Sequence, residues 1–112
     1  MARTPSLADA DLAKAADSAV LGMNYPATVG QSCGSTSRLL RHESFGDPVL
    51  ESVVAQVRAI QVGHPWEPGF QMGPVIDRVH YEKSMAAVAA AQAGGASVLA
   101  GGGRPSTVVD EG

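Results

Sequence analysis

The sequence predicts an α/β fold with a mainly parallel sheet, and three observations support this. The chain has 112 residues, of which 45% are hydrophobic and 17% are charged, a globular composition. Two segments repeat apolar residues at three- and four-residue spacing, as amphipathic helices do. Short apolar stretches alternate with these segments, and such alternation is typical of strands and helices in an α/β domain.

The first part of the chain predicts a strand, a helix and a long loop. Residues 3–8 are expected to form the end of a strand. Asp9 can cap the helix that follows, because its carboxylate can accept free backbone N–H groups. Residues 24–37 contain Pro26, Gly30 and Gly34, which predict a loop. The apolar stripe of the helix consists of Leu12, Ala16, Ala19, Val20 and Met23.

The second part predicts two more helices and two more strands. Residues 38–45 are expected to form a strand, in which the charge of Arg41 needs a partner if it is buried. Asp47 and Pro48 suit the start of a helix that ends before Gly63. The prolines and glycines of residues 63–75 predict an irregular connection, residues 77–95 a third helix, and residues 96–103 a short strand. The apolar face of the middle helix consists of Val49, Val53, Val57 and Ile60.

Charge and composition exclude several classes of protein. A formal net charge of −3 leaves no basic stripe for nucleic acid. No run approaches the roughly 18 apolar residues of a membrane helix, and the N-terminus lacks the apolar centre of a signal peptide. A single cysteine cannot form an internal disulfide. We therefore expect a soluble, cytoplasmic protein that does not bind nucleic acid or membranes.

The one cysteine lies in the stretch "VGQSCGSTSR". A nucleophilic cysteine must be a thiolate that substrate can reach, near groups that stabilise negative charge. Gly30 and Gly34 beside Cys33 remove side-chain bulk and allow backbone N–H groups to approach a bound carbonyl oxygen. The residues alone leave two alternatives open, a reactive thiol and an inert cysteine in a turn.

The same stretch resembles the active-site segment of the aldehyde dehydrogenase superfamily. That segment reads Gly-Gln-x-Cys, then three residues, then Ser-Arg, and Gly30, Gln31, Cys33, Ser37 and Arg38 match it. The resemblance covers nearly the whole chain. It includes "PSLADADLAKAADSAVLG" before the cysteine, "LLRHESFGDPVLESVVAQVRAIQVGHPWEPGFQMGPVID" after it, and "GGASVLAGGGRP" further on.

The resemblance implies a chemistry for Cys33. Its thiolate would attack an aldehyde to give a thiohemiacetal, and hydride transfer to NAD+ or NADP+ would leave a thioester that water hydrolyses to the acid. The backbone N–H of Cys33 would help to hold the oxyanion. The resemblance also implies cofactor-ribose contacts near His80 and Lys83, and an assembly of identical subunits. An ordinary solvated helix face remains the alternative for His80 and Lys83.

The resemblance is to one slice of a longer catalytic domain. Residues 1–112 are expected to be a fragment of that domain, with the cofactor-binding domain absent, because no GxGxxG-type loop is present. The general base and a side-chain donor of the oxyanion hole are missing from the matched segments. We therefore expect little independent catalysis. A non-catalytic remnant and an interaction fragment that pairs with a full-length relative are the alternatives.

Other conspicuous residues give weaker indications. His42, His64 and His80 are too widely spaced for a zinc site, so no metal is expected. The glycines at positions 101–103 predict a turn rather than a phosphate-binding loop, because no helix with Lys-Ser/Thr follows. Trp66 is expected to be a packing residue within its loop.

Overall fold

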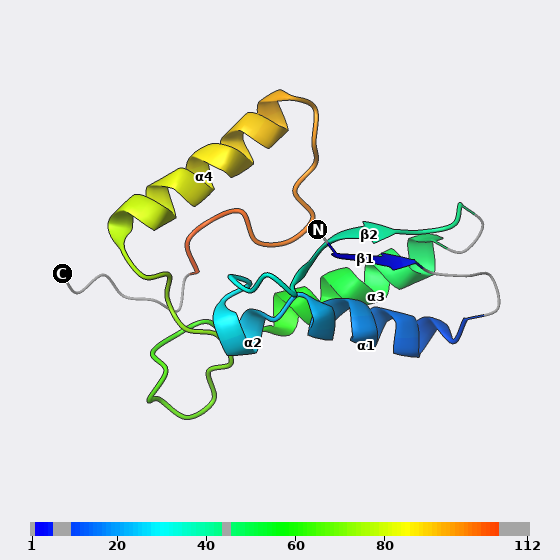
Figure 1. Cartoon of the computed structure of the whole chain (residues 1–112), viewed down its shortest axis with the longest axis horizontal. Coiled ribbons are helices and arrows are strands. Elements are labelled where there is room, and N and C mark those ends of the chain that lie inside the picture. Colours follow the sequence, from blue (N-terminus) through cyan, green and yellow to red (C-terminus); the bar gives the residue numbers. More distant parts are fainter. Residues whose placement is uncertain (1, 6–9, 44–45, 106–112) are drawn as a thin grey trace. The chain divides into compact units, whose positions relative to one another are not determined.

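A computed structural model describes residues 2–5, 10–43 and 46–105. The chain divides into two compact units, Met1–Ile60 and Gln61–Gly112. The first unit contains β1 (Ala2–Pro5), α1 (Leu12–Gly22), α2 (Tyr25–Thr28), β2 (Thr36–Leu40) and α3 (Gly46–Ala59), and the second contains α4 (Arg78–Ala93) (Figure 1). Helices and strands are mixed, as the sequence predicts. None of the helices within the described ranges is long and apolar enough to span a membrane.

The strands β1 and β2 pair in parallel (Figure 1). The chain passes between them through α1 and α2, because parallel neighbours need a crossover connection. The predicted strand over residues 38–45 is shifted, since β2 begins at Thr36 and ends at Leu40. Arg41 therefore lies beyond the strand. The register joins Ala2 to Thr36, Arg3 to Arg38, Thr4 to Leu39 and Pro5 to Leu40, with an irregularity after Ala2.

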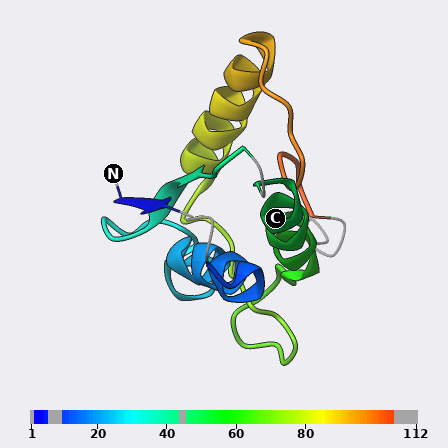
Figure 2. The same cartoon turned by 90° about the vertical axis from the view of Figure 1, so that its right-hand side faces the viewer.

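The core of the first unit lies between α1 and α3, which Figure 2 shows nearly end-on. The predicted stripes of both helices supply most of it. Leu12, which is 37% exposed, and Ile60, which lies beyond the end of α3, are not part of the cluster. Gln56 of α3 donates a hydrogen bond of 2.7 Å to Asp17 of α1 beside this core. The buried residues are Ala16, Ala19, Val49 and Val53, and the half-buried residues packed on them are Val20, Met23, Leu39 and Val57.

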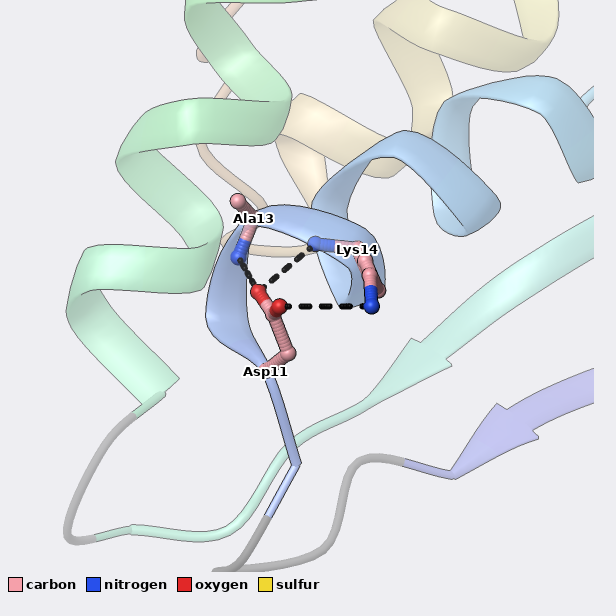
Figure 3. A network of polar contacts seen from close by, with 3 residues as sticks. All are labelled: Asp11, Ala13 and Lys14. Carbon is pink, nitrogen blue, oxygen red and sulfur yellow. Dashed lines mark hydrogen bonds and ion pairs between the residues drawn. The ribbon is translucent and has the colours of Figure 1, made fainter.

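The N-cap of α1 is Asp11, so the prediction that Asp9 caps this helix is wrong. Asp11 Oδ1 accepts hydrogen bonds from the backbone N–H groups of Ala13 at 3.1 Å and Lys14 at 3.2 Å (Figure 3). Its other oxygen lies 3.8 Å from Lys14 Nζ. Both aspartates precede the apolar stripe, and only the point at which the backbone becomes helical decides between them. Asp9 itself lies outside the described residues.

The start of α3 also differs from the expectation. The helix begins at Gly46, so Asp47 lies in its first turn instead of at the cap, and it ends at Ala59. Arg41 Nη1 lies 2.6 Å from Asp47 Oδ1. Arg41 is exposed, so its charge is not buried in a strand, and it is paired with Asp47.

The second unit begins with the expected irregular connection. Within it, Gly63 donates a backbone hydrogen bond to Met72 O at 3.0 Å, and Val62 forms an isolated bridge with Met72. Asp77 caps α4 by accepting from the His80 N–H at 2.7 Å, and Gly94 ends the helix, which confirms the predicted bounds. The strand predicted over residues 96–103 is wrong. These residues are irregular because an extended segment becomes a strand only when it pairs with another.

Candidate functional site

Cys33 lies at the corner of a tight turn between α2 and β2, and its side chain is exposed. The Ser35 N–H donates to Ser32 O at 3.0 Å, and the Gly34 N–H donates to Ser32 Oγ at 3.2 Å. These two bonds close the turn around Cys33. Neither the thiol nor the backbone N–H of Cys33 has a hydrogen-bond partner among the described residues. Both groups are therefore free to interact with a bound molecule.

The chain reaches this turn through α2, which the sequence analysis assigned to a loop. Asn24 and Val29 on either side of the helix have left-handed φ values of 56° and 54°. Such a φ is unusual for a β-branched residue, so Val29 is strained. Pro26 lies in the first turn of α2, where its missing N–H costs no helical hydrogen bond. Pro26, from which the sequence predicts a loop, therefore lies in the first turn of a short helix.

Backbone hydrogen bonds hold this strained approach. The Val29 N–H donates to Tyr25 O at 3.0 Å, and the Gln31 N–H donates to Thr28 O at 2.9 Å. Gly30 follows with a φ of 76°, which a glycine adopts without steric cost. The position of Cys33 is thus fixed by the main chain of residues 24–31.

A small cavity of about 100 Å³ lies in the first unit, beside the strand that follows Cys33. Ser35, between the turn and the strand, has a buried hydroxyl with no hydrogen-bond partner among the described residues. A Cβ atom on Gly22 would lie 2.7 Å from Thr36 Oγ1, so α1 approaches β2 closely at this point. The cavity is lined by Ala19, Met23, Tyr25, Thr36, Ser37, Arg38 and Leu39.

The two predicted cofactor contacts lie on α4 in the second unit. His80 is half-buried, and its backbone carbonyl accepts a hydrogen bond of 2.8 Å from Ser84 Oγ. Lys83 is exposed, three residues further along the same helix. Cys33 belongs to the first unit, and a role for His80 and Lys83 in cofactor binding stays a prediction.

The remaining candidates show no assembled site. Among the described residues, no three His, Cys, Asp or Glu side chains are grouped so that they could hold a metal ion. The Trp66 ring is stacked on the His64 ring with 5.5 Å between centroids, but Trp66 is 80% exposed, so its expected packing role is limited to this contact. Gly101 and Gly102 have φ values of 70° and 78° in an exposed irregular segment, as a turn requires.

Comparison with known proteins places this segment in a family. The model of the aldehyde dehydrogenase family matches residues 6–112. Aminoaldehyde dehydrogenase 2 of Pisum sativum is 41% identical over 97 residues, which are 87% of this chain and 19% of that protein. Betaine aldehyde dehydrogenase of Amaranthus hypochondriacus is 40% identical over 97 residues, which are again 87% of this chain and 19% of that protein.

Solved structures agree with the sequence comparison. Betaine aldehyde dehydrogenase from Staphylococcus aureus, in complex with NAD+, matches 95% of this chain with a TM-score of 0.85 and 31% identity. Succinate-semialdehyde dehydrogenase from Burkholderia pseudomallei matches 94% with a TM-score of 0.84 and 32% identity. In both cases the match covers 21% of the solved chain. The chain spans about a fifth of the length of these relatives, and it belongs to the aldehyde dehydrogenase family.

Proposed function

We propose that Cys33 is the nucleophile of an oxidoreductase that converts an aldehyde to a carboxylic acid. The observation that carries this proposal is the exposed, unpartnered thiol at the corner of the turn, within a segment that matches the family. A thiol that reacts with a carbonyl must be reachable by its substrate. Cys33 meets this condition because its side chain is exposed.

The proposed reaction uses two covalent steps on Cys33. The thiolate sulfur forms a bond to the aldehyde carbon, and the carbonyl electrons move to oxygen to give a thiohemiacetal anion. This anion collapses to a thioester as its carbon loses a hydride, which is a two-electron oxidation of the substrate. Water then adds to the thioester, the C–S bond breaks, and Cys33 leaves as a thiolate together with the acid and a proton.

The backbone around Cys33 fits the charge that develops on oxygen. The Cys33 N–H has no partner among the described residues, while the neighbouring Gly34 N–H is occupied by Ser32 Oγ. A free N–H beside the reacting sulfur can donate to the oxyanion when it forms. We propose this donor as one part of the oxyanion site.

NAD+ or NADP+, when bound, would accept the hydride from the substrate carbon. Solved relatives from Staphylococcus aureus and Bacillus cereus are described in complex with NAD+, which supports this choice. On this chain, the exposed ammonium of Lys83 can donate to hydroxyl or phosphate oxygens, and His80 lies one turn earlier on α4. The residues described here contain no glycine-rich loop between a strand and a helix, so they supply at most one edge of a cofactor site.

The test uses a chimera, because the family activity belongs to longer proteins. Residues 10–105 replace the matching segment of the Staphylococcus aureus enzyme, and NADH or NADPH formation is measured with betaine aldehyde and with an aminoaldehyde. We expect turnover that Cys33→Ser lowers by about a thousandfold or more, while Ser97→Ala, at an exposed residue outside the turn, retains it. A folded chimera that keeps its turnover after Cys33→Ser would refute the proposal.

A second assay addresses the 112-residue chain itself. No carboxylate or imidazole is hydrogen-bonded to the Cys33 thiol within the described ranges. We expect the chain alone to be modified by thiol reagents but not to turn over aldehyde. Sustained NADH formation by the purified chain, lost on Cys33→Ser, would show that this expectation is wrong. A cytoplasmic location stays a prediction that cell fractionation can check.

The non-catalytic alternative, an interaction fragment, has its own supporting observation. Helix α4 has sixteen residues and none of them is buried. The family assignment holds under either function, because it depends on sequence and fold.

A further inference from the structure

The turn that contains Cys33 can be classified from its hydrogen bonds and dihedral angles. The Ser35 N–H donates to Ser32 O at 3.0 Å, so residues 32–35 form a β-turn in which Cys33 and Gly34 are the two central residues. Neither central residue has a positive φ. Types I′, II and II′ each require a positive φ at a central residue, so this turn is of type I.

The glycine at position 34 makes a second conformation of the same turn accessible. Type I and type II turns differ mainly in the peptide group between the two central residues, which is turned over by roughly 150°. Type II requires a positive φ at the second central residue, and a glycine adopts that φ without steric cost. The backbone at Gly34 therefore permits both orientations of the Cys33–Gly34 peptide.

The side chain of Ser32 distinguishes between these two orientations. Its Oγ accepts a hydrogen bond from the Gly34 N–H at 3.2 Å. Turning the peptide over would direct this N–H away from Ser32 and break the bond. Ser32 is half-buried, whereas Cys33 and Gly34 are exposed, so the acceptor is the better fixed of the two partners. One hydrogen bond of this kind corresponds to roughly a two- to tenfold preference for the observed orientation.

We propose that Ser32 is a positioning residue for Cys33, because its hydroxyl holds the Cys33–Gly34 peptide in the observed orientation. This peptide is bonded to the carbon that carries the thiol side chain, and its dipole acts on charge that develops beside it. Turning the peptide over would reverse that dipole next to the reacting atoms. The hold on the peptide depends on the turn alone, while its effect on turnover rests on the proposed role of Cys33.

The first experiment measures this hold in the 112-residue chain, without turnover. NMR follows hydrogen exchange of the Gly34 amide in the parent chain, in Ser32→Ala and in Ser32→Thr, which keeps a hydroxyl. We expect exchange about two- to tenfold faster in Ser32→Ala and close to the parent rate in Ser32→Thr. Ser97→Ala, the same chemical change at an exposed residue outside the turn, is the matched control and should leave the rate unchanged. Equal rates in the parent and in Ser32→Ala would overturn the proposal.

The second experiment measures kcat and KM in the chimera that carries residues 10–105. We expect Ser32→Ala to lower kcat about two- to tenfold with little change in KM, because substrate still binds while fewer molecules hold the peptide in the observed orientation. Ser32→Thr should restore kcat. An unchanged kcat in Ser32→Ala would overturn the proposal, as would an equal loss in Ser32→Thr.

A double variant of the chimera tests the orientation of the peptide itself. Ser32→Ala with Gly34→Ala lacks the hydroxyl, but alanine at position 34 disfavours the positive φ of a type II turn. We expect the double variant to recover most of the kcat that Ser32→Ala loses, and no recovery would overturn the proposal. Turnover that survives Cys33→Ser would instead refute the proposed function. In that case the exchange of the Gly34 amide would still decide whether Ser32 holds the peptide.

Discussion

At the scale of single residues, the main chain before Cys33 fixes the position of this cysteine. Asn24, Val29 and Gly30 have left-handed φ values, and they turn the chain out of α2 toward the cysteine. Strain of this kind persists where surrounding contacts fix it, and it is often found at functional sites. The hydrogen bonds from Val29 to Tyr25 and from Gln31 to Thr28 provide that support.

Gly30→Ala tests this view of the turn. Its φ of 76° is costly for a side chain with a Cβ atom, so we expect the free energy of unfolding to fall by about 1–2 kcal/mol in urea denaturation. Gly34→Ala is the matched control. Gly34 has no positive φ, and a Cβ there would lie 3.7 Å from Ser32 Oγ, an ordinary contact. An equal loss at Gly30 and Gly34 would contradict the role of the left-handed turn.

At the scale of the elements, each helix depends on a different part of its sequence. Helix α1 depends on the side chain of Asp11, which satisfies two backbone N–H groups (Figure 3). Helix α3 depends on its buried valines, and α4 on Asp77 at one end and Gly94 at the other. The ion pair between Lys14 and Asp11 is largely exposed, and a pair of that kind contributes little.

Asp11→Ala should destabilise the chain by about 1 kcal/mol, because the cap is lost. Asp11→Asn removes the charge but retains an oxygen that can accept the same hydrogen bonds. Its free energy of unfolding should therefore be close to that of the parent chain. Urea unfolding followed by circular dichroism measures both. If Asp11→Asn were as destabilised as Asp11→Ala, the ion pair with Lys14 would matter more than the cap.

Val53→Ala tests the contact between α1 and α3. Val53 is 5% exposed within the core cluster, and removing two buried methyl groups should cost about 2 kcal/mol. Val79→Ala makes the same chemical change on α4 at a residue that is 73% exposed, and it should have almost no effect. The denaturant midpoint of unfolding is measured for both variants. Equal midpoints would show that Val53 is not part of the stabilising core.

At the scale of the whole molecule, the small buried core is the main feature. The buried hydrophobic residues of the described chain are two alanines and two valines, all in the first unit. Such a core stabilises a fold weakly, because each side chain removes little apolar area from water.

Limited proteolysis tests the division of the chain into two units. Trp66 is 80% exposed in the irregular connection near the start of the second unit, while Tyr25 lies in α2 and Tyr81 in α4. We expect chymotrypsin to cut first after Trp66, since exposed loops are cleaved before helices. Mass spectrometry identifies the products, and Trp66→Ala should slow the first cut. A first cut after Tyr25 or Tyr81 would show that a helix opens before the connection does.

The sequence by itself determined the local features of this protein. The valine spacing of α3 and the Asp77 and Gly94 ends of α4 could be predicted because helix periodicity and capping depend on neighbouring residues. The motif around Cys33 indicated the family for the same reason, since its residues are adjacent in the chain.

The tertiary structure decided what depends on residues far apart in sequence. The cap at Asp11 instead of Asp9, the irregular conformation of residues 96–103 and the start of β2 at Thr36 depend on where the chain packs and pairs. The short helix α2 depends on left-handed residues that local propensity does not favour. Only the fold showed that neither the thiol nor the N–H of Cys33 has a hydrogen-bond partner within the described ranges, because such partners are known only once the chain has folded.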